Sequence, residues 1–244
     1  MENTEIIILA AGKGTRMGAD IPKCLVPVKG VPIIERLLAN LKKALVNKPL
    51  LVTGHKAEVI ENYLGDRARY ARQIEQKGTA HAAQTALRAI LPTTKNVVIL
   101  YADHPFVSGD TVARLLSCLE DNTIGLATLD GGDFSGWKSI FKHWGRIIYS
   151  ESGSIEKVTE YKDADEATRV LSKVNPGFYA VRVDWLRTAL EKIRPNNAQG
   201  EYYLTDIIKI AQDDGQTIGE ISVEPFEAMG LNSREEIAYA ESLI

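Results

Sequence analysis

The sequence predicts an α/β protein with a mostly parallel mixed sheet flanked by helices, and three observations support this fold class. Residues 6–9 form an unbroken aliphatic run, which is typical of a strand buried on both faces of a parallel sheet. Apolar runs and amphipathic segments alternate through the first half, as they do in βαβ units. The chain of 244 residues is long enough for one sizeable core, and no linker, repeat or low-complexity tract marks a second. We therefore expect one domain, residues 1–244.

The same alternation gives the expected elements in chain order. Strands are expected near 5–10, 49–53, 70–75, 97–101 and 123–129. Helices are expected near 32–46, 56–64, 79–91 and 108–120. Later strands near 146–149, 155–160 and 174–182 are expected to be antiparallel or at an edge, and helices follow near 183–193, 204–213 and 233–243. Right-handed crossovers would place the loops after the parallel strands along one edge, so distant segments can share a cleft.

Composition and charge exclude several classes of partner. Hydrophobic residues make up 45% and charged residues 25%, as in ordinary globular proteins. The formal net charge of −3 argues against broad nucleic-acid binding. No apolar stretch approaches the roughly 20 residues that a membrane span needs, and no signal-peptide pattern begins the chain. Cys24 and Cys118 are too few for a disulfide framework. We expect no membrane partner and a cytoplasmic location, and the sequence leaves open whether the chain forms a homo-oligomer.

The loop after the first strand has the composition of a phosphate site. Its small residues, which let backbone N–H groups approach a ligand, are Ala10, Ala11, Gly12 and Gly14. Its positive side chains are Lys13, Arg16 and Lys23. Met17 stands where the dinucleotide fingerprint needs glycine, and no Walker pattern is present. An ordinary Gly-rich turn would explain the glycines alone, but three cations in one turn favour a chain of phosphates.

Asp103 follows the buried strand 97–101 and is the candidate metal ligand. Mg²⁺ prefers oxygen ligands and is commonly held by one or two protein groups together with substrate phosphates. The alternative is an aspartate that caps the helix beginning near Ser108. The basic loop elsewhere in the fold favours the metal.

Gln76, Gly78 and Thr79 follow the strand near 70–75 and open the next helix. An amide can pair with the edge of a nucleobase, and glycine lets a flat base approach the backbone. The alternative is a helix-capping turn with Thr79 as the cap.

Polar groups at later turns and strand ends suit sugar recognition, although each alone is a weak signal. Glu160 could be a solvated strand residue, Tyr203 a core contact, and Asn232 the cap of the last helix. The aromatic segment 134–144 interrupts the regular pattern and could be a lid, a subunit contact or local packing, with packing or contact favoured.

Together these segments resemble the sugar-phosphate nucleotidylyltransferases, most closely the uridylyltransferase domain of N-acetylglucosamine-1-phosphate uridylyltransferases. The strongest matches are residues 9–17 with Pro22-Lys23, residues 76–82, residues 197–208 and residues 230–234. The resemblance implies a Rossmann-like nucleotide-diphospho-sugar transferase fold. It implies a nucleotide-binding part at about 1–125 and a sugar-binding part at about 126–244.

The resemblance also implies an activity and site residues. UTP and N-acetylglucosamine 1-phosphate would give UDP-N-acetylglucosamine and pyrophosphate, with Mg²⁺ as cofactor. The nucleotide would contact Leu9, Ala10, Ala11, Gly12, Gly14, Thr15, Arg16, Lys23, Gln76, Gly78 and Thr79. The sugar phosphate would contact Gly145, Glu160, Asn175, Tyr203 and Thr205. Asp103 and Asn232 would bind the metal, and Arg16, Lys23 and Asp103 would carry the catalysis.

The sequence departs from the family pattern at several places. Ala102 and Ala80 replace glycines, Trp144 replaces a tyrosine, and the segment 134–144 is longer than usual. The sequence ends at Ile244, so the acetyltransferase domain of the bifunctional enzymes is not expected. Two other readings stay open: a related transferase that uses dTTP or CTP with another sugar phosphate or phosphocholine, and a non-catalytic nucleotide-sugar-binding regulator.

Overall fold

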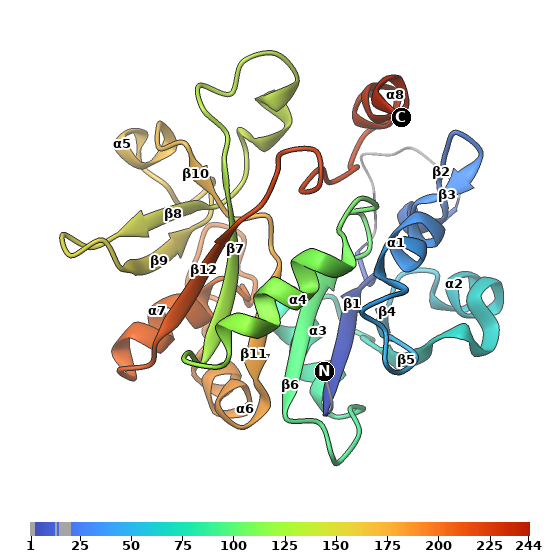
Figure 1. Cartoon of the computed structure of the whole chain (residues 1–244), viewed down its shortest axis with the longest axis horizontal. Helices are drawn as coiled ribbons and strands as arrows, with labels where there is room; N and C mark the ends of the chain where they lie inside the picture. The colour runs from blue at the N-terminus through green and yellow to red at the C-terminus, as the bar shows by residue number, and fades with distance from the viewer. Residues whose placement is uncertain (1–2, 13, 15–20) are drawn as a thin grey trace.

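A computed structural model of the chain describes residues 3–12, 14 and 21–244. One mixed sheet runs through the molecule with helices on both faces (Figure 1). Its strands, in chain order, are β1 (Thr4–Leu9), β4 (Leu50–Thr53), β5 (Arg69–Arg72), β6 (Asn96–Tyr101), β7 (Ile124–Asp130), β8 (Arg146–Tyr149), β9 (Ile155–Thr159), β10 (Lys173–Val174), β11 (Tyr179–Arg182) and β12 (Ile218–Ser222). A separate hairpin consists of β2 (Pro27–Val28) and β3 (Val31–Pro32).

The sheet has a parallel half and an antiparallel half. The order is β5-β4-β1-β6-β11-β7-β10-β8-β9, and β12 pairs with β7 off this path. β5, β4, β1 and β6 are mutually parallel, so their carboxyl ends meet at one edge. β11 lies antiparallel between β6 and β7, and β8, β9 and β10 are antiparallel. The α/β class and the antiparallel later strands predicted from the sequence are confirmed.

The helices cover the sheet because successive residues of each central strand point to opposite faces. Ile6 and Ile8 of β1 pack into one core with α1 (Ile33–Leu41), α2 (Ala57–Leu64) and α4 (Gly109–Cys118). Ile7 and Leu9 pack into the other with α3 (Thr79–Leu87), α6 (Val183–Lys192) and α7 (Asp206–Asp213). Every residue of β1 is buried, which explains its unbroken aliphatic run. A short α5 (Glu166–Arg169) and the last helix α8 (Arg234–Leu243) complete the set in the described ranges.

Some element boundaries differ from the sequence predictions for identifiable reasons. One strand was expected at 174–182, but β10 ends at Val174 and β11 begins at Tyr179. Pro176 has no N–H to donate, and Gly177 adopts φ of +85°, so residues 175–178 leave the strand conformation. The hairpin β2-β3 and strand β12 were not predicted. Both strands of the hairpin are only two residues long, and β12 lacks an aliphatic run.

The aromatic segment contains a 3-10 helix, η4 (Gly136–Phe141). Phe141 is fully buried, and Trp137 and Ile140 pack against the core beneath α1 and against α8. Local packing, one of the favoured readings of this segment, is confirmed.

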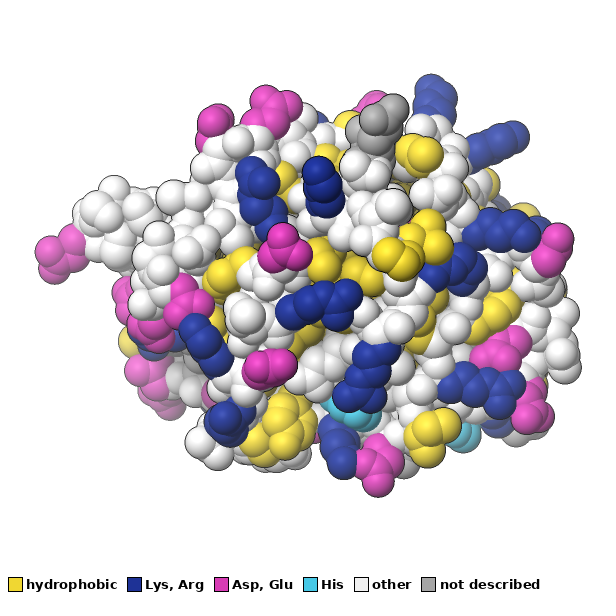
Figure 2. All heavy atoms as spheres, turned by 90° about the horizontal axis from the view of Figure 1, so that it is seen from below, with side chains coloured by type: hydrophobic (Ala, Val, Ile, Leu, Met, Phe, Trp, Pro, Cys, Tyr) yellow, Lys and Arg dark blue, Asp and Glu magenta, His cyan; other side chains and the backbone are white. Residues whose placement is uncertain are grey.

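The end of the molecule seen in Figure 2 shows Lys and Arg side chains interspersed with Asp and Glu, not gathered into one basic patch. In the described ranges no helix is both long and apolar enough to span a membrane.

Candidate active site

A cavity of about 660 Å³ opens at the carboxyl ends of the parallel strands. Segments far apart in sequence converge on it. The described residues that line it are Leu9, Ala10, Ala11, Gly12, Gly14, Pro22, Lys23, Cys24, Gln73, Gln76, Gly78, Thr79, Ala82, Tyr101, Ala102, Asp103, Glu201 and Asn232. Every predicted nucleotide-binding or metal-binding residue in the described ranges is among them. Lys13, Thr15 and Arg16 lie outside the described residues.

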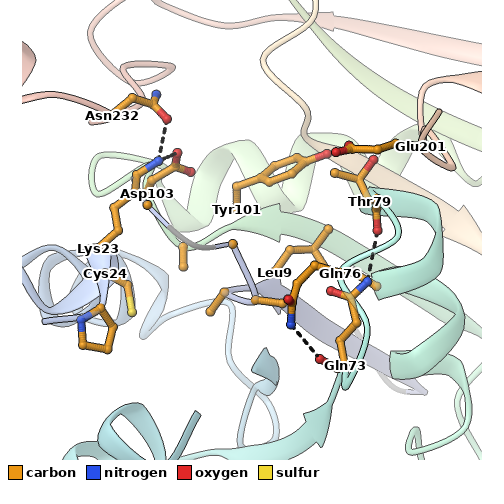
Figure 3. Close-up of a pocket in the computed structure, with 18 residues that line it drawn as sticks. Leu9, Lys23, Cys24, Gln73, Gln76, Thr79, Tyr101, Asp103, Glu201 and Asn232 are labelled. Atoms are coloured by element: carbon orange, nitrogen blue, oxygen red, sulfur yellow. Dashed lines mark hydrogen bonds and ion pairs between the residues drawn. The ribbon is translucent and has the colours of Figure 1, made fainter. Parts of the chain in front are cut away.

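Lys23, Asp103 and Asn232 meet at one end of this cavity (Figure 3). Lys23 opens the 3-10 helix η2 (Lys23–Leu25), Asp103 lies two residues beyond β6, and Asn232 precedes α8. The Lys23 ammonium forms an ion pair with Asp103 Oδ2 and donates a hydrogen bond to Asn232 Oδ1 at 2.5 Å. The Leu231 N–H donates to the Asp103 carbonyl oxygen at 2.8 Å, which fixes the last segment beside the loop after β6.

The electrostatics of this cluster favour an ionised carboxylate. Burial opposes ionisation of Asp103, but the Lys23 ammonium outweighs it and lowers the pKa of the carboxyl. His104 itself is buried, which lowers the pKa of its imidazole, and its Nδ1 lies 2.9 Å from the Ala228 carbonyl oxygen. Burial raises the pKa of the neighbouring Cys24 thiol to about 12, so this cysteine is a packing residue and not a reactive thiolate.

The oxygen atoms around Lys23 suit a divalent cation. A carboxylate oxygen and an amide oxygen converge on one positive charge, the Lys23 ammonium, which stands where a cation would lie. Among the described residues no cluster of three or more His, Cys, Asp or Glu side chains could hold a metal. A two-oxygen set therefore fits Mg²⁺ completed by phosphates and water better than a closed protein site.

Neither Asp103 nor Asn232 is a helix cap, so the capping alternatives for both are wrong. Ser108 caps α4 by accepting a hydrogen bond from the Thr111 N–H at 3.1 Å. Ser233 caps α8 in a reciprocal capping box with Glu236. A side chain capping its own helix would be held at the helix end, and these two instead point into the cavity (Figure 3).

The opposite end of the cavity is built around the turn before α3. Gly78 has φ of +117°, and a Cβ atom there would lie 2.5 Å from the Tyr202 carbonyl oxygen. The Tyr202 backbone pairs with this turn, because its N–H donates to Lys77 and its carbonyl oxygen accepts from Ala80. Thr79 does not cap α3, contrary to the alternative reading, because its Oγ1 accepts a hydrogen bond from the Leu204 N–H at 2.9 Å.

Buried Gln73 holds the same turn from inside. Its Nε2 donates to the Gly78 carbonyl oxygen at 3.1 Å and lies 2.9 Å from His81 Nδ1. Gln76 Nε2 donates in turn to the Gln73 carbonyl oxygen at 3.1 Å. The turn that carries the predicted base-binding residues is therefore fixed by a side chain at the end of β5.

Of the predicted sugar-phosphate residues, Gly145 and Thr205 contact Glu160, and Glu160 alone lines one of the two cavities. Glu160 lines a second cavity of about 710 Å³, while Thr205 Oγ1 donates to Glu160 Oε1 at 3.1 Å. Burial raises the pKa of the Glu160 carboxyl. A Cβ atom at Gly145 would lie 3.5 Å from Glu160 Cδ, so this glycine packs directly beside it.

Asn175 and Tyr203 are more deeply buried than Glu160. Asn175 Nδ2 donates to the Tyr179 hydroxyl at 2.6 Å, and its Oδ1 accepts from the Gly177 N–H at 2.9 Å. The Tyr203 hydroxyl is buried, and burial raises the pKa of this phenol to about 12. Neither Asn175 nor Tyr203 lines one of the two cavities. Their contact with a sugar stays a prediction.

The lining residues that were not predicted as site residues include Gln73, Tyr101 and Glu201. Tyr101 ends β6 and Gln73 follows β5, so the rule that sites lie at the carboxyl ends of parallel strands could have found both. Glu201 comes from the loop before α7, within the run 197–208 that carries part of the family resemblance.

The sequence of this chain matches a known protein family. Residues 6–198 match the MobA-like NTP transferase domain, which is most of the chain. The chain belongs to this family. The nucleotidyltransferase family predicted from the motifs is thereby confirmed, and the matched range contains the described residues of the loop after β1, Asp103 and Glu160.

Curated relatives of this MobA-like chain agree with the assignment. It is 39% identical over 240 residues to the bifunctional protein GlmU of Desulfotalea psychrophila, covering 97% of this chain and 69% of that protein. It is 37% identical over 247 residues to the bifunctional protein GlmU of Caldanaerobacter subterraneus subsp. tengcongensis, covering 100% of this chain and 52% of that protein. The chain thus spans from about half to two thirds of these relatives' length.

Solved structures support the fold of the MobA-like domain. A putative glucose-1-phosphate thymidylyltransferase from Bacillus anthracis superposes with a TM-score of 0.73 at 18% identity, covering 98% of this chain and 94% of that one. A 4-diphosphocytidyl-2C-methyl-D-erythritol synthase from Anaerococcus prevotii gives a TM-score of 0.67 at 15% identity, covering 98% and 97%. At these identities the likeness shows the nucleotide-diphospho-sugar transferase fold alone.

Proposed function

We propose that this protein transfers a uridylyl group from UTP to N-acetylglucosamine 1-phosphate, releasing pyrophosphate and forming UDP-N-acetylglucosamine. The observation that carries this proposal is the meeting of Lys23, Asp103 and Asn232 at one end of the cavity, with Gln76, Gly78 and Thr79 at the other. That separation suits a nucleotide whose phosphates lie at the cationic end and whose base lies at the turn before α3.

The choice of UTP and an amino sugar rests on sequence. The run at 197–208 and the run at 230–234 resemble the N-acetylglucosamine-1-phosphate branch, and the matched curated relatives carry the name bifunctional protein GlmU. The structural neighbours include a putative thymidylyltransferase, so the base must be tested directly.

In the proposed reaction a phosphate oxygen of the sugar phosphate attacks the α-phosphorus of UTP in line. A new P–O bond forms at the α-phosphorus, the bond to the β-phosphate oxygen breaks, and its electron pair leaves with pyrophosphate. The attacking phosphate is already ionised at neutral pH, so no strong general base is needed. Such transfers depend on positioning and on neutralising charge.

The chain's own residues would supply both the positioning and the neutralisation of charge. Lys23 would leave Asp103 and Asn232 to pair with the phosphates, and Gly14, with φ of +61°, lets the loop backbone approach beside Lys23. Asp103 and Asn232 would hold Mg²⁺, which when bound neutralises phosphate charge at the reacting centre. Arg16 would add a further cation. The Gln73 contacts would keep Gln76 and Gly78 in position for the base.

A matrix of UTP, dTTP, CTP, ATP and GTP against N-acetylglucosamine 1-phosphate, glucose 1-phosphate and phosphocholine tests the proposal. The measurement is pyrophosphate release with Mg²⁺ present. The proposal expects UTP with N-acetylglucosamine 1-phosphate to give the largest kcat/KM. A larger value for another pair reassigns the substrates, and nucleotide-sugar binding without pyrophosphate release favours the regulatory alternative.

A further inference from the structure

The second cavity has a composition that the proposed site residues do not explain. Its volume is about 710 Å³, in the range of small-molecule sites. The described residues that line it are Tyr101, Trp137, Ser139, Ile140, His143, Trp144, Glu160, Asn232, Ser233, Glu235, Glu236 and Tyr239. Most come from the aromatic segment around η4 and from α8. Of the predicted sugar-phosphate residues, Glu160 alone lines it.

The two cavities adjoin at the metal-binding end of the nucleotide cavity. Tyr101 and Asn232 line both of them. A molecule in the second cavity can therefore place one end beside Asn232 and Lys23 while its remainder extends between η4 and α8. An acceptor whose phosphate reacts at that end would have this arrangement.

The aromatic side chains pack against one another along one side of the second cavity, which we call the aromatic wall. Trp137 stacks on Tyr239 with ring centroids 5.7 Å apart and an interplanar angle of 18°, which joins η4 to α8. Trp144 packs edge-on against Phe141 at 4.8 Å and lies 5.6 Å from His104. Trp137 and Trp144 are only partly buried, so ring surface remains open to a ligand. Rigid aromatic surfaces provide large contact area at low cost in side-chain entropy.

Acidic side chains outnumber basic ones in the described lining of this cavity, which includes His143. Three carboxyl groups line it, from Glu160, Glu235 and Glu236, and its described lining contains no lysine or arginine. Carboxylates accept hydrogen bonds from hydroxyl groups and repel a second anion. The cavity thus suits hydroxyl-bearing groups and disfavours a carboxylated one.

We propose that the part of the acceptor beyond its phosphate lies in this cavity against Trp137, Trp144 and Tyr239, and that Glu160 and Glu235 select acceptors with no second anionic group. The inference deepens the proposed function and rests on it for the position of the phosphate. It assigns to the aromatic segment and to α8 the recognition of a neutral sugar, and it makes Trp137 and Glu235 specificity-determining residues.

Kinetics of two variants test the aromatic wall and the acidic selection separately. Trp137→Ala should raise the KM for N-acetylglucosamine 1-phosphate about tenfold and leave the KM for UTP within about twofold, because the ring lines only the acceptor side. Trp185→Phe is the matched control, since Trp185 lies on α6 and lines neither cavity. Glu235→Gln should raise the relative kcat/KM for glucuronic acid 1-phosphate about threefold. Glu120→Gln, outside both cavities, should not.

Failure of this inference is distinguishable from failure of the proposed function. The kinetics use whichever nucleotide and acceptor release pyrophosphate, so a different base leaves the acceptor assay valid. If Trp137→Ala does not fold, the Glu235→Gln variant still tests the proposed selection of acceptors, because this substitution removes a charge and little packing. In the Trp185→Phe protein Trp137 and Trp144 are the remaining tryptophans, so N-acetylglucosamine 1-phosphate added with UDP and Mg²⁺ should change the tryptophan emission. Unchanged acceptor KM and unchanged discrimination in both variants, or unchanged emission at saturating acceptor, would overturn the inference.

Discussion

Lys23, Asp103 and Asn232 lie far apart in the sequence, yet their polar atoms meet at one point. Each had a simpler interpretation from the sequence: Lys23 as a loop cation, and Asp103 and Asn232 as helix caps. The structure removes the capping readings, because Ser108 and Ser233 cap the helices concerned. We therefore expect the cluster to be the chemical centre of the site.

Asp103→Asn keeps the shape of the side chain and removes its charge. We expect pyrophosphate release to fall by about 10³-fold, because a preorganised charge at the reacting centre is lost. Asp110→Asn, an exposed aspartate in the first turn of α4, is the control and should retain activity. Wild-type turnover in Asp103→Asn, with an unchanged circular dichroism spectrum, would remove Asp103 from the mechanism.

Gly78→Ala tests the turn at the base end. The new Cβ would lie 2.5 Å from the Tyr202 carbonyl oxygen at φ of +117°, so we expect the protein to lose about 2 kcal/mol of stability and to bind UTP more weakly. Gly215→Ala is the control, because Gly215 has φ of +66° with nothing within 4 Å of its Cβ position. Equal urea midpoints for the two variants would show that the Tyr202 contact does not matter.

The Arg146 side chain holds the aromatic segment 134–144 against the rest of the fold. It is fully buried and donates to the carbonyl oxygens of Trp144 at 2.5 Å, Lys142 at 2.8 Å and Arg169 at 2.9 Å. Its guanidinium also lies over the rings of Phe134 and Tyr161. Among the described residues no carboxylate pairs with it, so its role is to tie the aromatic segment to β8 and α5.

Arg146→Lys keeps the charge but removes the planar fork of donors. We expect a loss of about 2 to 3 kcal/mol in the free energy of unfolding, because buried carbonyl groups lose their partners. The KM for the acceptor should rise more than the KM for UTP, since Trp144 lies on the acceptor side. Arg187→Lys on α6 is the control. A thermal midpoint shared by both variants would contradict this role.

At the level of elements, periodicity predicted what depends on local sequence. The strand predicted near 5–10 and the helix predicted near 79–91 correspond to β1 and α3, whose observed bounds are Thr4–Leu9 and Thr79–Leu87. The break between β10 and β11 was missed, although Pro176 and Gly177 signal it. The second cavity could not be predicted, because it requires Trp137 from η4 and Tyr239 from α8 to stack. Such pairing depends on tertiary packing and leaves no periodic trace.

For the whole molecule, the parallel half of the sheet explains the site. Leu9, Tyr101 and Gln73 lie at neighbouring strand ends because β5, β4, β1 and β6 run in one direction. The sequence could place these residues on one edge by the crossover rule. It could not place Asn232 beside Asp103, since the path from β12 to α8 follows no such rule, and only the family resemblance pointed there.

The stability of the whole molecule should depend on pH through Asp206 at the start of α7. Burial, with a smaller effect of Asp163, raises the pKa of the Asp206 carboxyl to about 6. The folded state therefore favours the protonated form, so this contribution is full below pH 4 and is lost as pH rises through about 6. Asp206→Asn should gain about 1 kcal/mol relative to the wild type between pH 4 and pH 7, after allowance for solvent screening.

Urea unfolding at pH 4.5 and pH 7.5 measures this difference. Asp184→Asn, an exposed aspartate in the first turn of α6, is the matched control. If the wild-type and Asp206→Asn proteins change in parallel between the two pH values, the raised pKa is not present in the folded protein.

We propose that Asp103 and Asn232 hold a divalent cation against nucleotide phosphates at the position of the Lys23 ammonium. An anomalous difference map of crystals grown with UTP and Mn²⁺ in place of Mg²⁺ tests it most directly. We expect one peak within bonding distance of an Asp103 carboxylate oxygen and the Asn232 amide oxygen, with Lys23 turned toward the phosphates. A UTP complex in which Lys23 still joins Asp103 to Asn232, and the peak is absent or lies elsewhere, would contradict the account.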